Sequence, residues 1–373
     1  MERAQASTSM FTEVWAVWNK SNSSTGESVC HNYYNVASTV VLSALIGLVC
    51  IVTITGNTLV IVAFAVDRKL RSFGNYFILN LALSDLIVGL LIGIYAPYVL
   101  RGCWQLTRPG CLAFLLLDYV VPLTSAWNMA LISLDRYWSV ARPIEYRLKM
   151  STNVAVLSMS VPWLAGTIWY LPSVLLWETL SGQQTDVPDG KCFVDFYKNV
   201  GYLVACSCVE FVLPFVTVAT INVLIYLNIR RRSRGLMMAS SLTTAASSSI
   251  SAADDSQTTA KAKKLLSRDK RSARSLAILI VVFLFTWAPY EICAFVDPVC
   301  NFCIPNFTLE VVFWLLWLNS TINPILYPFL QQRFRVTFMR LLGCSRAMTQ
   351  SEATSLQTRN DRAACQMSRL TPR

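Results

Sequence analysis

The 373-residue sequence has few charged residues and a single histidine. Charged residues make up only 14% of it, whereas a soluble domain usually carries about 25%. With His31 alone, the chain cannot form a His-based catalytic triad or the common zinc sites of hydrolases. It also lacks GxxxxGK[ST] and GxGxxG, the glycine-rich motifs that bind phosphate groups. We therefore do not expect an enzyme, and we do not expect a fold that is soluble in water.

What the sequence has instead is apolar residues, which make up 54% of the chain. A helix needs about 20 such residues in a row to cross a bilayer. We therefore predict an all-α membrane protein, a bundle of seven transmembrane helices whose two ends lie on opposite sides. The predicted spans are 38–66, 75–99, 111–134, 154–177, 199–229, 275–296 and 308–330.

The distribution of basic residues orients this bundle. If the N-terminus lies outside, only six of the 32 Lys and Arg residues fall on the outer side, and the other 26 fall on the inner side. This asymmetry satisfies the positive-inside rule, so we predict an outer N-terminus and an inner C-terminus. The net charge of +11 then reflects membrane topology and an inner docking surface, and we expect no nucleic-acid partner. The six outer residues are Arg3, Lys20, Arg101, Arg108, Lys191 and Lys198.

We divide the chain into an extracellular tail (1–36), the bundle (37–332) and a cytoplasmic end (333–373). The tail has no apolar segment that would mark a cleaved signal peptide, and it carries glycosylation sequons at Asn19 and Asn22.

Two inner segments have distinctive compositions. The inner loop 230–271 is basic at both ends and rich in Ser, Thr and Ala between them. We expect its middle to be disordered and its ends to extend the fifth and sixth helices. FLQQRFRVTFMRLLGC, at 329–344, predicts a short amphipathic helix on the inner leaflet, with Cys344 as a candidate for palmitoylation.

Six of the twelve cysteines fall on the outer side, where disulfides can form. Cys111, at the mouth of the third span, and Cys192, before the fifth, are predicted to pair, as are Cys300 and Cys303 of CNFC. A zinc site is the alternative for CNFC, but the chain offers neither a second CxxC nor more than one histidine. Cys30 and Cys103 remain, with their pairing left open.

Four carboxylates lie well inside the predicted spans, away from their ends: Asp85, Asp118, Glu210 and Glu291. Each costs about 3 kcal/mol at the centre of a membrane helix, so each is a candidate for function. The alternative is a carboxylate that hydrogen-bonds its neighbours and serves packing alone.

Three of these acids are expected in the outer half of the membrane. Asp118 lies two helical turns from Cys111, Glu210 precedes Pro214, and Glu291 follows Trp287 by one turn. Acids among aromatic rings suit an organic cation, because ring faces attract ammonium groups. Packing and the interfacial aromatic belt are the alternative role for these rings. The rings at similar depth are Tyr119, Trp287, Tyr290, Trp314 and Trp317.

A fifth acid, Asp135, lies 17 residues after Asp118, or about 26 Å along a helix, and so at the inner surface. Arg136 follows it directly and predicts a local ion pair. Asp269, at the base of the sixth span, is a second candidate partner for Arg136, and an arginine with two partners can act as a switch. The alternative is a set of solvated charges that anchor the helix end.

These features occur together with motifs that resemble those of the rhodopsin-like G-protein-coupled receptors, over roughly 37–343. Seven motifs appear in order across seven spans, which makes the resemblance specific. They are GNTLV with Asn57, NLALSD with Asp85, Cys111, Asp135-Arg136-Tyr137, Trp163, FTWAPY with Trp287 and Pro289, and NPILY with Asn323 and Pro324.

Within that family, Asp118 matches the aspartate by which aminergic receptors bind an ammonium group. Further segments resemble histamine receptors of subtypes three and four, among them LWETLSG, CVEFVLPF, RDKRSARSLAIL and FWLLWLNS, the last containing Trp317. The resemblance implies a plasma-membrane receptor for a small cationic amine, histamine first, in which Glu210 contacts the second basic group. It also implies a heterotrimeric Gi/o protein that lowers cyclic AMP, with arrestin and a receptor kinase as further partners.

Two positions depart from the histamine pattern. Glu291 stands where those receptors carry a small hydroxyl residue, and Pro122 removes the hydrogen bond that would end on the Asp118 carbonyl. A third acid favours a more strongly dicationic ligand, such as a diamine.

The resemblance also implies an allosteric sodium ion near mid-membrane, held by Asp85 with Ser125, Asn319 and Asn323 nearby. A protonated Asp85 in a hydrogen-bonded network is the alternative. We expect no other cofactor.

Other classes fit less well. A light sensor would need a lysine in the seventh span, but Lys270 is the last lysine in the chain. A seven-helix transporter would account for acids in the membrane but not for Asp135-Arg136-Tyr137 beside basic inner loops. Within the receptors, muscarinic-like, serotonin-like and trace-amine-like proteins are the alternatives, and they usually carry Ala, Ser or Thr at the position of Glu210.

Overall fold

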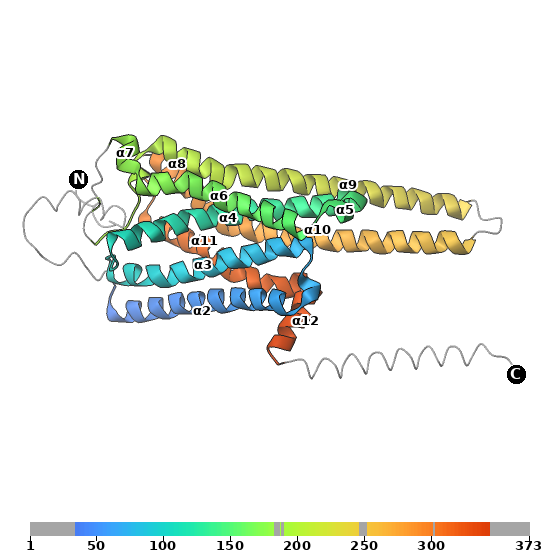
Figure 1. Ribbon diagram of the computed structural model, residues 1–373, viewed down its shortest axis with the longest axis horizontal. Helices are drawn as coiled ribbons and strands as arrows, with labels where there is room; N and C mark the ends of the chain where they lie inside the picture. The colour runs from blue at the N-terminus through green and yellow to red at the C-terminus, as the bar shows by residue number, and fades with distance from the viewer. Residues whose placement is uncertain (1–33, 183–186, 188–189, 246–251, 301–302, 344–373) are drawn as a thin grey trace, which may run out of the picture.

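The computed structural model describes residues 34–182, 187, 190–245, 252–300 and 303–343, and these residues form helices and no strand. Seven helices are long and apolar enough to cross a membrane, as predicted (Figure 1). They are α2 (Val36–Val66), α3 (Phe73–Arg101), α4 (Arg108–Ala141), α6 (Thr152–Leu175), the continuous run of α8 (Val200–Ser207), η3 (Cys208–Val212) and α9 (Leu213–Ala245), α10 (Ala252–Val299), and α11 (Asn306–Leu330).

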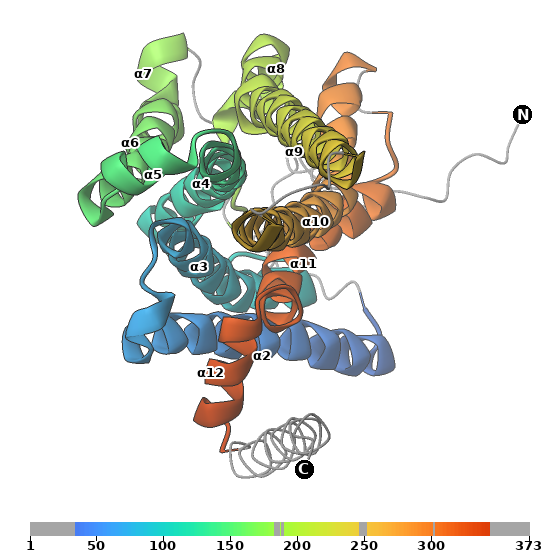
Figure 2. The ribbon, with the colours of Figure 1, turned by 90° about the vertical axis from the view of Figure 1, so that its right-hand side faces the viewer.

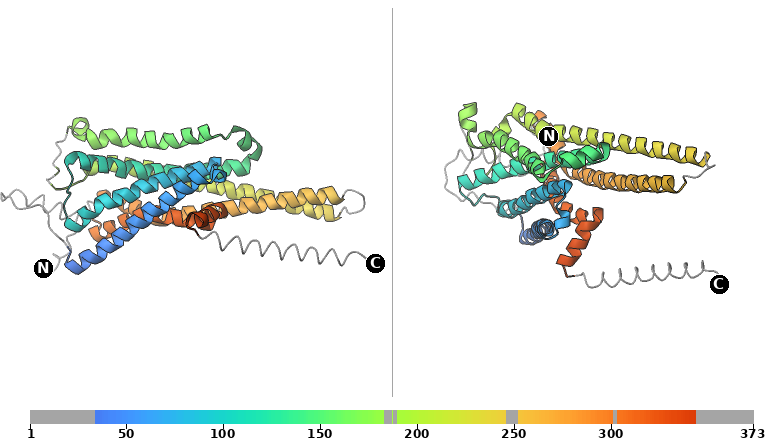
Figure 3. Two further views of the ribbon diagram at one scale, coloured as in Figure 1. Left: turned by 60° about the horizontal axis from the view of Figure 1, so that its bottom comes forward. Right: turned by 45° about the vertical axis from the view of Figure 1, so that its right-hand side comes forward.

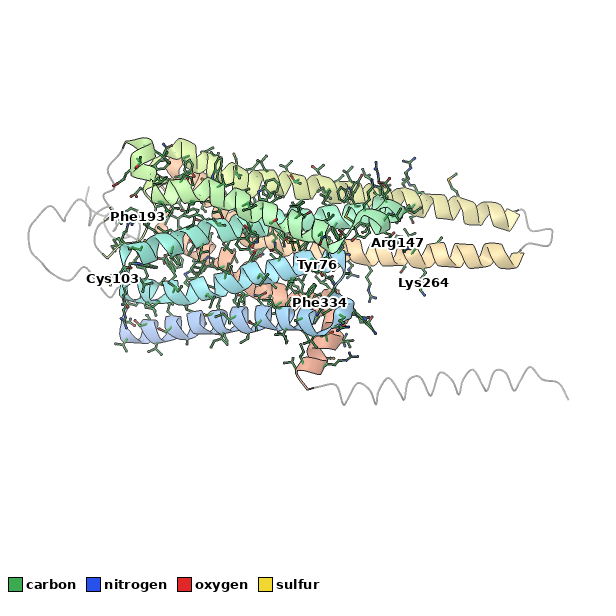
Figure 4. All side chains as sticks on the ribbon, in the orientation of Figure 1. Tyr76, Cys103, Arg147, Phe193, Lys264 and Phe334 are labelled. Carbon is green, nitrogen blue, oxygen red and sulfur yellow. A yellow bond between two sulfur atoms is a disulfide. The ribbon has the colours of Figure 1, made fainter. Side chains whose placement is uncertain are left out.

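Shorter helices connect the spans. They are η1 (Arg68–Leu70), α5 (Pro143–Lys149), α7 (Trp177–Ser181), η2 (Asp195–Lys198) and α12 (Gln332–Leu341). Figure 4 places Cys103 and Phe193 at one end of the bundle and Arg147 and Lys264 at the other. From the distribution of basic residues, the first is the outer end and the second the inner end.

The helices form one bundle, seen along its axis in Figure 2, in which α4 contacts α3, α6, α9 and α10. The most apolar window of α3 is 61% buried, whereas that of α2 is only 11% buried. A helix that is apolar all round but barely covered by protein is suited to contact with lipid, so α2 lies at the edge of the bundle.

Buried amides tie the helices together at mid-membrane. Asn57 donates to the backbone oxygens of Thr53 (2.9 Å) and Ser320 (3.0 Å), which joins α2 to α11. Asn80 of α3 donates to Asn128 of α4 at 3.1 Å and accepts from the Trp163 indole of α6 at 3.0 Å. These hydrogen bonds account for the polar residues of GNTLV and NLALSD and for Trp163 within otherwise apolar spans. Each amide needs such partners, since an unpaired amide would be costly in hydrocarbon.

The ends of the inner loop 230–271 extend the fifth and sixth helices, as predicted, and they extend further into the loop than expected; residues 246–251, in its middle, lie outside the described residues. Helix α9 continues to Ala245 and α10 begins at Ala252, and the two run side by side well beyond the other spans (Figure 3). Ala, Leu, Met and Lys are good helix formers, and a helix already formed in the membrane extends without a new nucleation step. The segment therefore needs no hydrophobic core to be helical.

The amphipathic helix predicted after the seventh span is present as α12. Its Phe334 and Phe338 are buried against the bundle, and Figure 4 shows Phe334 where α12 meets it. The Thr337 hydroxyl donates to Asp67 at the end of α2, at 2.9 Å, and Arg333 lies 3.8 Å from the same carboxylate. Contacts to both α2 and α11 therefore fix the direction in which α12 leaves the bundle.

Candidate functional site

Asp118, Glu210 and Glu291 converge from three different helices at the outer half of the bundle. Asp118 lies on α4, Glu210 in η3 and Glu291 on α10, and Glu210 is close enough to the other two for their charges to interact. In the described part of the chain, no side chain donates a hydrogen bond to the Asp118 carboxylate or forms an ion pair with it. The arrangement therefore places three acidic groups where a cation could pair with them.

The backbone around Glu210 departs from a regular helix. Residues 208–212 form a π-helical turn, and Pro214 has no N–H to donate to the carbonyl of Glu210. The Val209 carbonyl in this turn accepts a hydrogen bond from the indole of Trp127 on α4, at 3.1 Å. The turn is thus held against α4, the helix that carries Asp118.

Two hydroxyl groups lie beside the glutamates. The Tyr170 hydroxyl on α6 donates to Glu210 Oε1. Glu291 is only 4% exposed, and the Ser207 hydroxyl of α8 faces its carboxylate. The hydrogen bond from Tyr170 therefore orients Glu210, as a preorganised ligand site requires, and Ser207 lies near Glu291.

Several of the aromatic rings considered in the sequence analysis pack against one another in this part of the bundle. Trp287 is buried and stacks on Phe283, with ring centres 4.9 Å apart. Trp317 packs on Phe313 at 4.6 Å and meets Trp314 edge-on at 5.3 Å. The Tyr290 hydroxyl interacts electrostatically with all three acids. These rings make the surroundings of the acids largely apolar.

Four contributors were not predicted from the sequence: Tyr170 and Ser207, described above, and Tyr95 and Phe196. The ring of Tyr119 lies 5.1 Å from that of Tyr170 and 5.4 Å from that of Phe196. Tyr95 of α3 meets Trp317 at 5.4 Å. Of these four, only Phe196 could have been found from the sequence, because it lies four residues after Cys192, which was predicted to form a disulfide with Cys111 of the third span.

The predicted disulfides are confirmed where the structure describes them. Cys111 is bonded to Cys192, and Cys300 is bonded to Cys303, so CNFC is not a zinc site. The first bond ties the segment containing Phe196 to the outer end of α4. Cys103 is also disulfide-bonded. Cys30, the sequons at Asn19 and Asn22, and Cys344 lie outside the described residues.

At the inner end, the local ion pair of Asp135 and Arg136 is present at 3.5 Å. The Asp135 carboxylate is buried and also accepts from the Tyr146 hydroxyl of α5 at 2.5 Å, while Tyr137 packs against the core. The backbone of α3 packs closely against this pair at Gly74, where a Cβ atom would lie only 2.5 Å from Asp135 Oδ2.

The expected contact between Arg136 and Asp269 is not formed. Asp269 of α10 pairs with Arg232 of α9 instead, at 3.3 Å. Helices α9 and α10 lie side by side at this depth, so Arg232 is the nearer guanidinium. The prediction that Arg136 has two acidic partners is therefore wrong for Asp269. The Arg232–Asp269 ion pair instead joins the inner parts of α9 and α10.

Asp85 lies at the centre of a second polar cluster at mid-membrane. Asn323 donates to Asp85 Oδ2 at 2.9 Å and to Asn319 Oδ1 at 3.3 Å. Asp85 Oδ1 and Ser125 Oγ are buried and have no hydrogen-bond partner among the described side chains. Oxygen atoms of this kind are the ligands that hard cations prefer, so Asp85 and Ser125, two of the four residues expected at the sodium site, fit such an ion.

Comparison with known proteins identifies the fold family. The model for "7 transmembrane receptor (rhodopsin family)" matches residues 56–327. The muscarinic acetylcholine receptor M1 of Homo sapiens is 28% identical over 404 aligned residues, which cover 80% of this chain and 88% of that receptor. The receptors of the same name from Sus scrofa and Mus musculus are 28% and 27% identical, with the same coverage.

Proposed function

Because this chain belongs to the rhodopsin family of seven-transmembrane receptors, we propose that it is a plasma-membrane receptor for a small amine with two basic groups, histamine first. The family is one of G-protein-coupled receptors and not of enzymes or transporters. Similarity to receptors named for acetylcholine supports an amine as the ligand class. The choice among amines rests on the residues of this chain.

The observation that carries the proposal is the pair formed by Asp118 and Glu210. Asp118 is half-buried and has no cationic partner in the described chain, so an ammonium group can take that role. Glu210, held by a hydrogen bond from the Tyr170 hydroxyl, offers a second acceptor to the same ligand. Two acids in one apolar enclosure select a ligand that neutralises both, because a carboxylate left unpaired there is costly.

In this proposal, the ligand activates the receptor by shifting its population of conformations. A cation that bridges α4 to η3 or α10 draws the outer ends of these helices together. The bridge favours the active state only by the difference in its affinity for the two states. Trp287, buried below Glu291 on α10, passes the change toward the inner end. There the Arg232–Asp269 and Asp135–Arg136 pairs rearrange to admit a Gi/o protein, with a receptor kinase and arrestin acting afterwards.

The test is inhibition of forskolin-raised cyclic AMP in cells that express the chain, with and without pertussis toxin, across histamine, acetylcholine, serotonin, trace amines and diamines. We expect a toxin-sensitive response to histamine that is lost in Asp118→Asn and reduced in Glu210→Ala. Cell-surface staining of each variant is the control for expression. A response to acetylcholine that persists in Glu210→Ala would overturn the choice of a dibasic ligand while keeping the amine receptor.

A diamine other than histamine is the second candidate, and Glu291 is the observation that favours it. This third acid is buried and interacts with Glu210, so the site offers more acidic groups than a monocationic ligand can pair with. A full response to an aliphatic diamine at concentrations where histamine is silent would favour this candidate.

We further propose that sodium binds at Asp85 and stabilises the inactive receptor. The unpartnered Asp85 Oδ1 and Ser125 Oγ support this, with Asn319 and Asn323 completing the cluster. Sodium chloride should lower agonist affinity more than N-methylglucamine chloride at equal ionic strength, and Asp85→Asn should abolish the difference. An equal effect of both salts on the unmodified chain would contradict the proposal.

A further inference from the structure

A cavity of about 340 Å³ lies at the inner end of the bundle, far from the amine site. Helix α10 contributes Arg271, and the rest of the lining comes from the last turn of α11 and from α12. At this end α10 lies beside α11, and α12 departs from the end of α11 (Figure 2). The lining residues are Arg271, Pro328, Phe329, Leu330, Gln332, Arg335 and Val336.

The two charged groups in the cavity are both arginines, and neither forms an ion pair within the described residues. The nearby acids are engaged elsewhere, because Asp269 pairs with Arg232 and Asp67 with Arg333. Arg271 and Arg335 therefore present uncompensated positive charge from two different helices. A planar guanidinium group binds phosphate oxygens through two parallel hydrogen bonds, so such a pair suits a phosphate group.

The surface above the cavity is apolar and exposed. On α11, Ile325 is 49% exposed and Phe329 is 81% exposed, one helical turn apart on the same face. On α10, Ile278 and Phe285 lie seven and fourteen residues after Arg271, so all three are on the same side of the helix. Both apolar side chains are exposed. In a membrane span, apolar side chains exposed in this way contact lipid tails.

We propose that this cavity binds the headgroup of an anionic phospholipid of the inner leaflet. Arg271 and Arg335 hold the phosphate, and the acyl chains lie along the exposed faces of α10 and α11. Basic pockets between helices on the cytoplasmic side of a membrane suit anionic lipids, which are enriched in that leaflet. Because the two arginines belong to different helices, one bound phosphate ties α10 to α12.

The test uses the purified full-length chain in detergent, titrated with phosphatidylserine and with phosphatidylcholine and followed by native mass spectrometry. We expect phosphatidylserine to bind preferentially, and Arg271→Gln/Arg335→Gln to weaken its binding by about tenfold or more. The matched control is Arg231→Gln/Arg340→Gln, which removes the same charge from two exposed inner residues outside the cavity. Arg271→Lys/Arg335→Lys keeps the charge but loses the paired hydrogen bonds of guanidinium, so its binding should be weaker than that of the unmodified chain and tighter than that of the glutamine variant.

Three results would overturn the proposal. The first is unchanged phosphatidylserine binding in the cavity variant, and the second is an equal loss in the control variant, which would indicate bulk attraction. The third is full competition by glycerophosphoserine or inorganic phosphate, which would make this a site for soluble anions and not for a lipid. Thermal unfolding of each variant monitors the fold, and Arg335→Gln alone, on the exposed face of α12, replaces the double variant if that one unfolds.

Discussion

The Tyr170 hydroxyl donates a hydrogen bond to Glu210 and so joins α6 to the π-helical turn of the fifth span. Tyr170 is fully buried, and its ring also contacts Tyr119, the neighbour of Asp118. One side chain thus touches the surroundings of both acids assigned to the ligand. Its two roles, as a hydrogen-bond donor and as a wall, can be separated by substitution.

Tyr170→Phe removes the donor and keeps the ring. A hydrogen bond to a charged group contributes about 1.5–3 kcal/mol, and part of this loss should appear as weaker ligand binding because Glu210 is no longer oriented. We expect the affinity of a dibasic agonist to fall about tenfold, and that of a monoamine held by Asp118 alone to stay within about twofold. Competition radioligand binding measures both. Equal losses for the two ligands would show that Tyr170 acts only through packing.

Glu291→Gln keeps the size of the side chain and removes one negative charge from the three-acid cluster. If the ligand uses only Asp118 and Glu210, the variant should bind it as well as the unmodified chain or better, because Glu210 loses a repelling neighbour. If the ligand uses Glu291, its affinity should fall by about tenfold or more, the usual effect of losing a charge-assisted contact. Parallel dose–response curves for histamine and an aliphatic diamine distinguish the cases, with Glu310→Gln at the outer end of α11 as the control for bulk charge.

Gly74→Ala should disturb the inner ion pair. Its new methyl group would lie 2.5 Å from Asp135 Oδ2 and 3.1 Å from a guanidinium nitrogen of Arg136, too close for either to stay in place. We expect altered basal inhibition of cyclic AMP, with the Asp135–Arg136 pair displaced. Gly47→Ala is the matched control, because nothing lies within 4 Å of its new Cβ and the helical preference for alanine is the same. Basal activity that is unchanged in Gly74→Ala would show that the pair can move aside without consequence.

The seven spans, the two disulfides and the convergence of Asp118, Glu210 and Glu291 could be predicted from the sequence. Each depends on a local property: a run of about 20 apolar residues, a cysteine at the mouth of a span, or an acid at a countable depth along a helix. Depth follows from counting residues, so three acids at one depth were expected to meet inside a closed bundle.

What could not be predicted depends on how helices are rotated and extended. Tyr170 contacts Glu210, and Asp269 pairs with Arg232 and not with Arg136, because of the faces that neighbouring helices turn toward each other. No property of a single helix specifies that meeting. The π-helical turn at 208–212 likewise combines a local cause, Pro214, with a tertiary one, the bond from Trp127. The extension of the fifth and sixth helices into the inner loop was predicted, but its length was underestimated, because a polar segment without a hydrophobic core was expected to be disordered although a helix needs no such core.

Docking of α12 should depend on pH through Asp67, which lies outside the spans. The pKa of Asp67 is lowered, first by the hydrogen bond from the Lys69 N–H and also by the Thr337 hydroxyl and the nearby Arg333 and Arg340. The Lys69 N–H acts with or without α12, whereas Thr337, Arg333 and Arg340 lower the pKa only in the docked state and so stabilise docking fully at pH values above the ordinary pKa of the carboxyl, about 4. That contribution is lost as the pH falls through the lowered value. A fluorophore at an exposed position of α12 should therefore report increased mobility only in acid. In Asp67→Asn the mobility should be raised already at neutral pH and show no acid transition, and a transition that persists in this variant would assign it to another group.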